Sequence, residues 1–461
     1  MVKLWGGRFR KKTDPRFEAF SSSFRWDVRL LPYDLAIDRA HVEALTRCGV
    51  LKAPEAARLG RAIGALERKN RSGTLRLDPS SEDVHSAVQT ALSRLAGPVA
   101  AKIHTARSRN DLVAQSSRLY CKDHAGRLEA LLRRLQSAFV RRADQNLGKF
   151  TAGRTHLEYA QPILLSHQLL AYVEMLERSK AKLAHARALS DVCVLGSGAL
   201  AGVTFALDQP RMARRLGLSA VVQNSYDAVG DRDFLLDLLE AIGSLGLTLS
   251  RIAEDLMVDK LSSRPVFEID ERFCTGSSMM PQKKNADFVE LVRGFAGLVQ
   301  ANAEGLRLTL KGLPSSYNRD LQWDKRYLFE SVESAEEVLE IFVSFVDALR
   351  CPEGRQTEIL GDLTKHDWIF ATDLADYLVS KGISFAQAHG QAGRIVRLAE
   401  AKGRPIAKLG LNLLRGLAPA IGPDVYRLFD PERSVQAKKT VGSTHPARVK
   451  QQIRKWKNRL S

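Results

Sequence analysis

Three polar segments of the sequence carry side chains suited to acid–base chemistry and to the binding of a small charged molecule. Residues 104–111, 153–162 and 275–287 each combine hydroxyl, amide and charged side chains with few large apolar ones. Each segment lies directly before a stretch with helical periodicity, and the first turn of a helix presents free N–H groups to an anion. Their composition therefore favours a role in binding or catalysis over a role in the packing of the hydrophobic core.

The first segment, residues 104–111, contains Ser108, Arg109 and Asn110, whose side chains donate hydrogen bonds suited to a carboxylate. These residues are candidates for substrate binding. The alternative is an ordinary solvated loop in which Asn110 or Asp111 caps the helix that follows.

The second and third segments carry the candidate acid–base groups. His156 is a candidate because an imidazole can both donate and accept a proton, although most single histidines in proteins are structural. Residues 275–287 are rich in glycine and serine, and they include the adjacent Lys283 and Lys284, which suit a small polyanion. Because this stretch has no helical or strand period, we expect a mobile lid over an active site. A flexible surface connection is the alternative.

Other patterns exclude several classes of protein. Residues 196–202 resemble a dinucleotide-binding loop, but the last glycine is one position too late and no βαβ unit surrounds it. The five cysteines are far apart and show no CxxC spacing, so we expect neither a disulfide framework nor a metal site. Without a signal peptide or a long apolar run, we expect a cytoplasmic protein with no membrane partner.

The net charge of +18 is compatible with an acidic partner such as nucleic acid. The basic residues are scattered over amphipathic segments and lack the interleaved aromatic residues of a surface that binds single strands. We interpret them as solvated helix faces, and we expect no nucleic-acid partner.

The rest of the chain, which must position these three segments, shows mostly helical periodicity, so we predict an all-α protein. A capping box is expected from Ser80 to Asp83, before a short helix. At about 1.5 Å per residue, the long helices would measure roughly 35 to 50 Å, which favours burial between several subunits. The five long amphipathic stretches are residues 111–144, 162–189, 234–256, 287–308 and 324–349, with Pro162 at a first helical position.

At the three polar segments the sequence resembles the fumarase/aspartase superfamily and, within it, the argininosuccinate lyases. The resemblance covers essentially the whole chain and includes residues 4–9, 82–85, 104–111, 153–162, 280–285, 317–322 and 370–377. The chain departs from the family pattern at Arg154, where a tyrosine is usual, and at Ala286, where a proline is usual.

The resemblance implies a subunit of three domains, residues 1–106, 107–357 and 358–461. Its five central helices would associate fourfold into a homotetramer with a twenty-helix bundle, and each active site would combine loops from three subunits. The implied activity is that of a carbon–nitrogen lyase without a cofactor or metal. It would split argininosuccinate reversibly into L-arginine and fumarate, the last step of arginine biosynthesis.

The resemblance also assigns roles to individual residues. Ser277 matches the proposed base of the family. His156 matches the proposed acid, and Glu290 would orient it. Lys283 and Asn285 would stabilise the developing negative charge. The positions implied for substrate binding are Asp83, His85, Ser108, Arg109, Asn110, Thr155, Arg232, Asn285, Tyr317, Gln322 and Lys325.

Two further hypotheses stay open at this point. A related lyase acting on another succinyl-amine, such as adenylosuccinate, would need a phosphate-binding addition, and the sequence has no evident one. A structural protein that has kept the fold but lost activity is opposed by the retention of Ser277, Lys283, His156 and Glu290.

Overall fold

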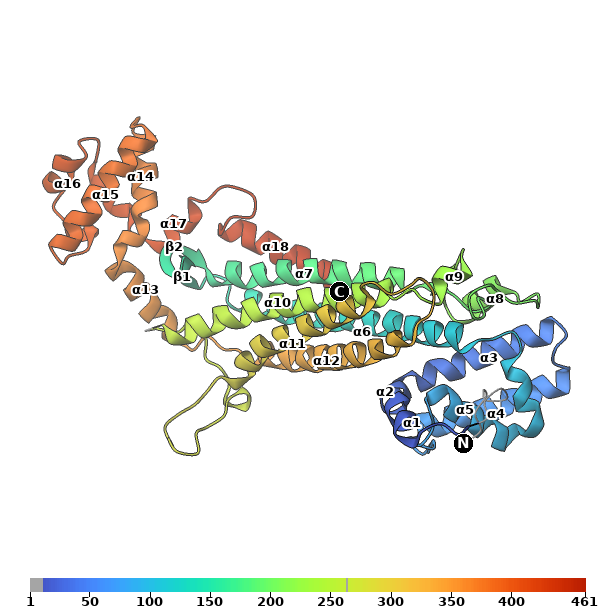
Figure 1. Cartoon of the computed structure of the whole chain (residues 1–461). Coiled ribbons are helices and arrows are strands. Elements are labelled where there is room, and N and C mark those ends of the chain that lie inside the picture. The colour runs from blue at the N-terminus through green and yellow to red at the C-terminus, as the bar shows by residue number, and fades with distance from the viewer. Residues whose placement is uncertain (1–10, 263) are drawn as a thin grey trace. The chain divides into compact units, whose positions relative to one another are not determined.

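The computed structural model describes residues 11–262 and 264–461, and these residues are mostly helical (Figure 1). The all-α class and the five long helices predicted from periodicity are confirmed. The long helices are α6 (Arg109–Gln145), α7 (Leu165–Leu189), α10 (Asp233–Leu261), α11 (Asp287–Leu310) and α12 (Asp324–Ala348). The sequence motif at residues 4–9 lies outside the described residues.

Shorter helices precede, interrupt and follow the long ones. They are α1 (Pro15–Ser21), α2 (Phe24–Asp27), α3 (Leu31–Arg47), α4 (Ala53–Arg71), α5 (Val84–Ala96), α8 (Gln209–Arg215), α9 (Ser225–Ala228), α13 (Arg355–Lys365), α14 (Ala371–Ser380), α15 (Phe385–Ala401), α16 (Leu411–Leu417), α17 (Pro431–Gln436) and α18 (Pro446–Leu460). In the part of the chain that the structure describes, none of the helices combines the length and apolar character needed to cross a membrane.

The chain divides into two compact units. Unit 1 contains the described residues up to Glu129, together with Ser179–Gly246 and Phe295–Glu337. Unit 2 contains Ala130–Arg178, Leu247–Gly294 and Val338–Ser461. Each of the five long helices contributes residues to both units.

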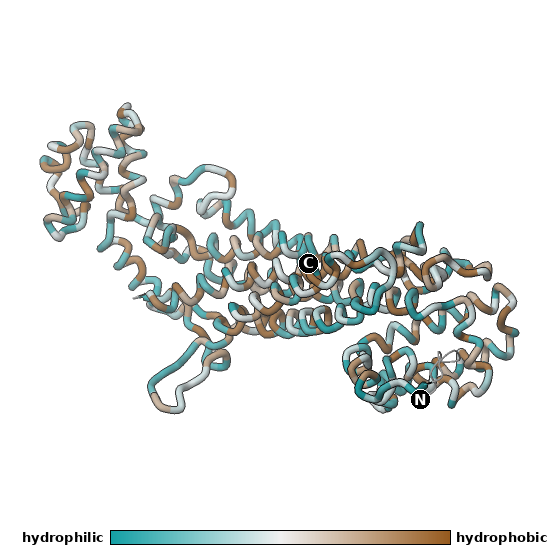
Figure 2. Tube along the Cα trace, viewed as in Figure 1, coloured by the Kyte–Doolittle hydropathy of each residue, from teal (hydrophilic) through white to brown (hydrophobic). Residues whose placement is uncertain are grey.

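Apolar side chains at helical spacing form the core in both units. One apolar stripe runs along α6, where Leu128, Leu131, Leu132, Leu135 and Phe139 are all buried. Figure 2 shows hydrophobic residues recurring along the long helices in the same way. Burial of such a stripe is the main source of stability for an amphipathic helix.

In unit 1, α3 packs against α4 and α5, and these three helices support the segment that precedes α6. Leu35, Ile63 and Leu92 from the three helices are buried in this core. Gly49, with a φ of +80°, follows α3 in the left-handed conformation that commonly ends a helix. This small helical core carries several of the residues that resemble the lyase pattern.

In unit 2, a cluster of aromatic side chains anchors the polar loop between α10 and α11. Phe273 comes before the loop and Phe288 after it, and both rings pack against Phe345 with centroid distances of 5.3 and 5.1 Å. Aromatic pairs of this kind favour edge-to-face and offset contacts. The two ends of the loop are therefore fixed in the core, although the loop itself is exposed.

The strands are few and short. β1 (Phe150–Thr155) and β2 (Glu158–Leu164) form an antiparallel hairpin, while β3 (Val192–Cys193) pairs in parallel with β4 (Ala220–Val221). The prediction that the second long helix starts at Pro162 is wrong. Pro162 lies within β2, and α7 starts at Leu165, since the backbone of residues 150–164 is satisfied by hairpin pairing instead.

Candidate active site

Unit 1 contains a cavity of about 480 Å³ that is lined mostly by polar and charged residues. Eight of the predicted binding residues line it: Asp83, His85, Ser108, Arg109, Asn110, Tyr317, Gln322 and Lys325. They come from the segment around the start of α5, the start of α6, and the segment that leads into α12. Polar residues that line the cavity without having been predicted are Ser23, Asp27, Glu82, His104, Arg107 and Arg319.

Asp83 is the N-cap of α5 and one of the wall residues. Its Oδ1 accepts a hydrogen bond from the Ser86 backbone N–H at 2.8 Å, and its Oδ2 accepts one from Arg109. The predicted capping box beginning at Ser80 is wrong, because the Ser80 N–H donates to Asp78 at 2.9 Å in a turn before the helix. The actual cap holds Arg109 against the cavity wall.

Ser108 caps α6 through a reciprocal pair of hydrogen bonds. Ser108 Oγ accepts from the Asn110 N–H at 3.2 Å, and Asp111 Oδ1 accepts from the Ser108 N–H at 3.0 Å. Ser108 is thus the N-cap of α6, and Asp111 at the third helical position accepts from the N-cap N–H as in one half of a capping box, so both bonds satisfy N–H groups that otherwise have no partner. The alternative in which Asn110 or Asp111 is the cap is therefore wrong.

The glycine-rich loop at residues 196–202 supports the same cavity. Asp111 Oδ2 accepts hydrogen bonds from the N–H groups of Gly196 and Gly198 at 3.2 and 3.0 Å. Asn110 Nδ2 donates to the Ala199 carbonyl at 3.1 Å, which orients the amide. At Gly198, with a φ of +60°, an added Cβ would lie 2.8 Å from the Gly202 carbonyl oxygen, so only glycine fits.

Lys325 is held by a network of buried ion pairs. Lys325 Nζ donates to Asp324 Oδ1 at 2.9 Å, and Arg232 Nε donates to Asp324 Oδ2 at 2.5 Å. Burial lowers the pKa of Lys325, but the negative charges of Asp324 and Asp27 and the hydrogen bond to Asp324 together outweigh burial, and the net shift of the pKa is upward. Arg232 does not line the cavity; it reaches Lys325 through Asp324.

His85 is a second titratable group at the cavity. Its Nδ1 bonds to Asp34, which also accepts from Ser116 Oγ at 2.5 Å. Burial lowers the pKa of His85, but the charge and hydrogen bond of Asp34, together with the charges of Asp83 and Asp27, outweigh burial, and the net shift of the pKa is upward. Nε2 is buried and has no hydrogen-bond partner among the described residues. An acceptor on a bound ligand would satisfy it.

Asp27 lines the cavity but was not identified from the sequence. Its side chain is almost fully buried, and one oxygen accepts from Ser23 Oγ. The other oxygen has no partner among residues 11–262 and 264–461. Burial raises the pKa of Asp27 to about 6, although the positive charges of Lys325 and His85 oppose the rise. A buried carboxyl without a full set of partners is suited to a ligand donor.

We expect Asp27→Asn to make the protein more stable at neutral pH. The folded pKa is raised from 3.8, so the folded state binds the proton more tightly and stability is lost as the pH rises from about 4 to about 6. Removing the charge should recover up to about 3 kcal/mol at pH 7 and about half of that at pH 5. Thermal unfolding of both proteins at pH 5 and pH 8 measures the difference. A lower Tm for the variant at pH 8 would contradict this account.

In unit 2, His156 lies at the tip of the hairpin. Thr155 and Glu158 are the last pair, and His156 and Leu157 between them have φ values of +54° and +66°. Two-residue hairpin turns of this kind usually contain Asn-Gly, because a left-handed residue with a side chain costs roughly 1–2 kcal/mol. Both residues are exposed. Backbone strain at residues other than glycine is common at functional sites, which supports a role for His156.

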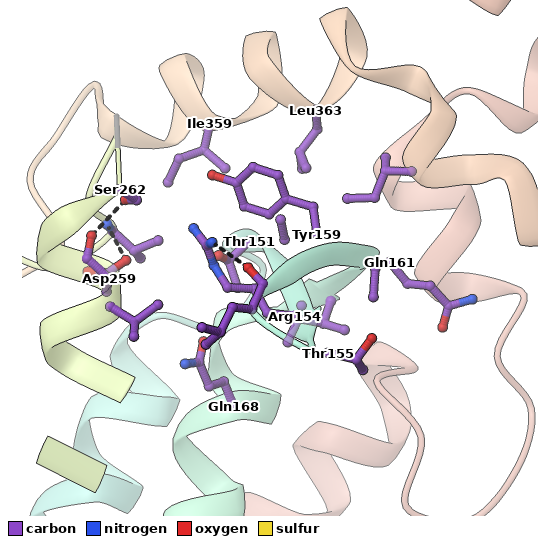
Figure 3. Close-up of a pocket in the computed structure, with 18 of the residues that line it drawn as sticks. Thr151, Arg154, Thr155, Tyr159, Gln161, Gln168, Asp259, Ser262, Ile359 and Leu363 are labelled. Atoms are coloured by element: carbon purple, nitrogen blue, oxygen red, sulfur yellow. Dashed lines mark hydrogen bonds between the residues drawn. The ribbon is translucent and has the colours of Figure 1, made fainter. Parts of the chain in front are cut away.

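A second cavity, of about 600 Å³, lies beside this hairpin (Figure 3). Thr155 and His156 line it together with residues of α7, α10 and α13. The hairpin is therefore not an isolated surface turn, because its two strands also form part of a cavity wall.

The loop between α10 and α11 projects from the ends of these helices (Figure 1). Its base is closed, because the backbones of Thr275 and Asn285 pair, and Thr275 N–H and Oγ1 donate to Asp287 Oδ2 at 2.8 and 2.7 Å. Lys283, further along the loop, is exposed.

Ser277 lies in this loop with its hydroxyl oxygen facing two backbone donors. Ser277 Oγ accepts hydrogen bonds from the N–H groups of Met279 and Met280 at 3.3 and 3.0 Å. Hydrogen bonds to an oxygen favour its negatively charged form. The local backbone therefore supplies donors of the kind that an alkoxide at Ser277 requires.

The predicted residues thus form two groups in different units. Eight of the eleven predicted binding residues line the cavity of unit 1, and Arg232 lies in the same unit behind Asp324. The other predicted residues belong to unit 2: Thr155, His156, Ser277, Lys283, Asn285 and Glu290. Among the described residues, no hydrogen bond or ion pair joins His156 to Glu290, or Lys283 to Ser277. Glu290 is exposed in the first turn of α11.

Comparison with known proteins identifies the family. Residues 7–301 match a lyase family, and residues 368–436 match the argininosuccinate lyase C-terminal family. The argininosuccinate lyases of Pelotomaculum thermopropionicum and Desulforudis audaxviator are each 40% identical to this chain, over 100% of the chain and 99% of the relative. A crystal structure of EDDS lyase in complex with formate matches with a TM-score of 0.83 and 27% identity, over 98% of this chain and 90% of that one. The chain belongs to the argininosuccinate lyase family.

Proposed function

We propose that this chain catalyses the reversible β-elimination of argininosuccinate to L-arginine and fumarate. The observation that carries the proposal is the cavity of unit 1, where eight residues of the argininosuccinate lyase pattern line one space. The full-length similarity to relatives named argininosuccinate lyase supports the same reaction. The substrate carries cationic and carboxylate groups, and the cavity offers charges of both signs.

The charges of the cavity suit the two ends of such a substrate. Lys325 and His85, whose pKa values are both raised, would attract the carboxylates of the succinyl end. Asp83, whose pKa is lowered although burial alone would raise it, is a carboxylate suited to a cationic group. Ser108 and Asn110 add neutral donors at the start of α6, and Tyr317 and Gln322 would complete the contacts.

Elimination removes a proton from the carbon next to a carboxylate and breaks the bond to the guanidino nitrogen. The electrons of the C–H bond form the new double bond, and negative charge accumulates in the adjacent carboxylate before nitrogen leaves. Ser277 would accept the proton as an alkoxide stabilised by the Met279 and Met280 N–H groups and by Lys283. Asn285 and Lys283 would stabilise the charge on the carboxylate.

The leaving nitrogen needs a proton, which His156 would donate. Glu290 would orient the imidazole and favour its protonated form. A positioned acid or base typically contributes roughly 10²- to 10⁴-fold to the rate. Thr155, next to His156 at the hairpin tip, would bind the same end of the substrate.

We also propose that the active form is a homotetramer with a twenty-helix bundle and with active sites shared between three subunits. Leu291, Leu298 and Leu308 on α11 and Leu247 on α10 are exposed, with exposed fractions of 71%, 40%, 62% and 53%. Exposed leucines along long helices are typical of faces that bury against other helices. Within each subunit we keep the three domains with boundaries near residues 106 and 357.

The proposed reaction implies a metabolic pathway and a cellular compartment for the protein. It would be the last step of arginine biosynthesis and would take place in the cytoplasm, with a small-molecule substrate and without a cofactor. The five cysteines, which include the buried Cys121 and Cys193, have no disulfide partner and suit a reducing compartment.

The decisive experiment measures fumarate release from argininosuccinate by ultraviolet absorbance, with adenylosuccinate as the competing substrate. We expect release from argininosuccinate alone. Release from adenylosuccinate would support a related lyase, and no release from a folded oligomer would support a structural protein. A titration with nucleic acid in dilute buffer tests the remaining alternative, and we expect no binding.

A further inference from the structure

The hairpin that carries His156 has an unusual tip that needs a specific stabilising contact. Both tip residues have positive φ, and neither is the glycine or asparagine that such a turn usually contains. The pairing is also irregular just before the tip, because the register shifts between Gly153 and Arg154. A bulge of this kind redirects a strand and is frequent next to active sites.

Arg154 makes the contact that crosses the tip. Its Nη1 donates a hydrogen bond to the Leu157 carbonyl at 3.2 Å. Its guanidinium carbon lies 4.2 Å from the ring centroid of Tyr159, the residue paired with it across the hairpin. The arginine therefore joins the strained turn to the opposite strand, in a stack that is favourable for a flat cation over an aromatic ring.

Tyr159 in turn fixes the hairpin to the rest of unit 2. Figure 3 shows its ring directed toward Ile359 and Leu363 of α13, with Arg154 on the other side of the ring. Both apolar side chains are buried. Asp259 on α10 interacts electrostatically with Arg154: burial raises the pKa of this carboxyl, and the positive charge of Arg154 opposes the rise. The pair of Arg154 and Tyr159, here called the clamp, therefore packs toward α13 and lies in the electrostatic field of a carboxylate on α10.

We infer that Arg154, stacked on Tyr159, is a positioning residue that holds the hairpin tip in the conformation from which His156 acts. This inference rests on the proposed role of His156 as the acid. Arg154 stands where the family pattern has a tyrosine, so this chain would fix its tip through a cation and an aromatic ring on opposite strands. The arginine would not touch the substrate.

The test is a double-mutant cycle on fumarate release from argininosuccinate. We expect Arg154→Ala to lower kcat by about 10- to 100-fold with little change in KM, because a displaced acid loses alignment. In a His156→Asn background, the same change should cost nothing further, since its effect passes through His156. Tyr159→Phe keeps the ring and should retain activity, whereas Tyr159→Leu should behave like Arg154→Ala.

Arg459→Ala is the matched control. Arg459 lies 5.0 Å from the centroid of Trp456 on α18 and pairs with Glu177, so the variant also loses a stacked arginine in unit 2, away from the hairpin. We expect it to keep full activity and to match Arg154→Ala in Tm. Full activity of Arg154→Ala, or an equal loss with and without His156, would overturn the clamp. Full activity of His156→Asn would instead overturn the proposed acid and the clamp together.

Discussion

Replacing Ser277 with alanine should lower kcat for argininosuccinate cleavage by about 10³- to 10⁴-fold, the upper part of the range for loss of a positioned base. The variant loses the oxygen that accepts the Met279 and Met280 N–H groups as well as the proposed proton acceptor. Because the base acts only in the chemical step, substrate affinity should change little. Steady-state rates of fumarate release and calorimetric titration with argininosuccinate measure the two quantities.

Ser278→Ala is the control for Ser277→Ala. Ser278 is the next residue on the same exposed loop, so its removal disturbs the loop surface without removing the proposed base. We expect it to keep wild-type activity. Comparable activity of the two variants would show that the hydroxyl of Ser277 is not the base, provided that both proteins keep the oligomeric state of the wild type.

A second large effect is expected for His156→Asn, which should lower kcat by about 10²- to 10⁴-fold. Asparagine is chosen because it adopts positive φ more readily than most residues, so the turn keeps its backbone conformation and only the imidazole is lost. The leaving nitrogen would then depart without a proton from the enzyme. Single-turnover measurements of fumarate formation separate this step from product release.

Leu157→Asn is the matched change at the neighbouring tip position. Leu157 is 72% exposed and also has positive φ, so asparagine should relieve strain and raise the Tm while leaving kcat near that of the wild type. If the two tip variants lost activity equally, the turn and not the imidazole of His156 would be what the reaction needs.

The elements that position the site differed in how well the sequence predicted them. The starts of α11 and α12 were predicted at Asp287 and Asp324, where the structure places them, because an acidic residue suits the first turn of a helix. The predicted start of α7 at Pro162 was wrong, because the restricted φ of proline fits a strand as well as a first helical turn. The hairpin before α7 lacks the Asn-Gly turn by which such hairpins are usually detected, since its tip is His156 and Leu157.

The cavity residues that were predicted came from the polar segment at residues 104–111 and from the positions that the family resemblance implies. Asp27 was missed because it lies in α2, a helix of four residues, with no local pattern that indicates a buried carboxyl. Arg232 was predicted to bind substrate, but in the structure it pairs with Asp324 and does not line the cavity. Arg232 would therefore act on the substrate only indirectly, by holding Asp324, which in turn binds Lys325.

The sequence by itself determined the helical class, the five long helices and the resemblance to a lyase family, because periodicity and residue type are local properties that can be counted along the chain. Only the tertiary structure decided which polar residues share a cavity and in which direction their pKa values are shifted there. His85 meets Asp34 across 51 positions, and Arg232 meets Asp324 across 92. The pKa of a buried group depends on such distant partners and on burial, neither of which is a property of the neighbouring sequence.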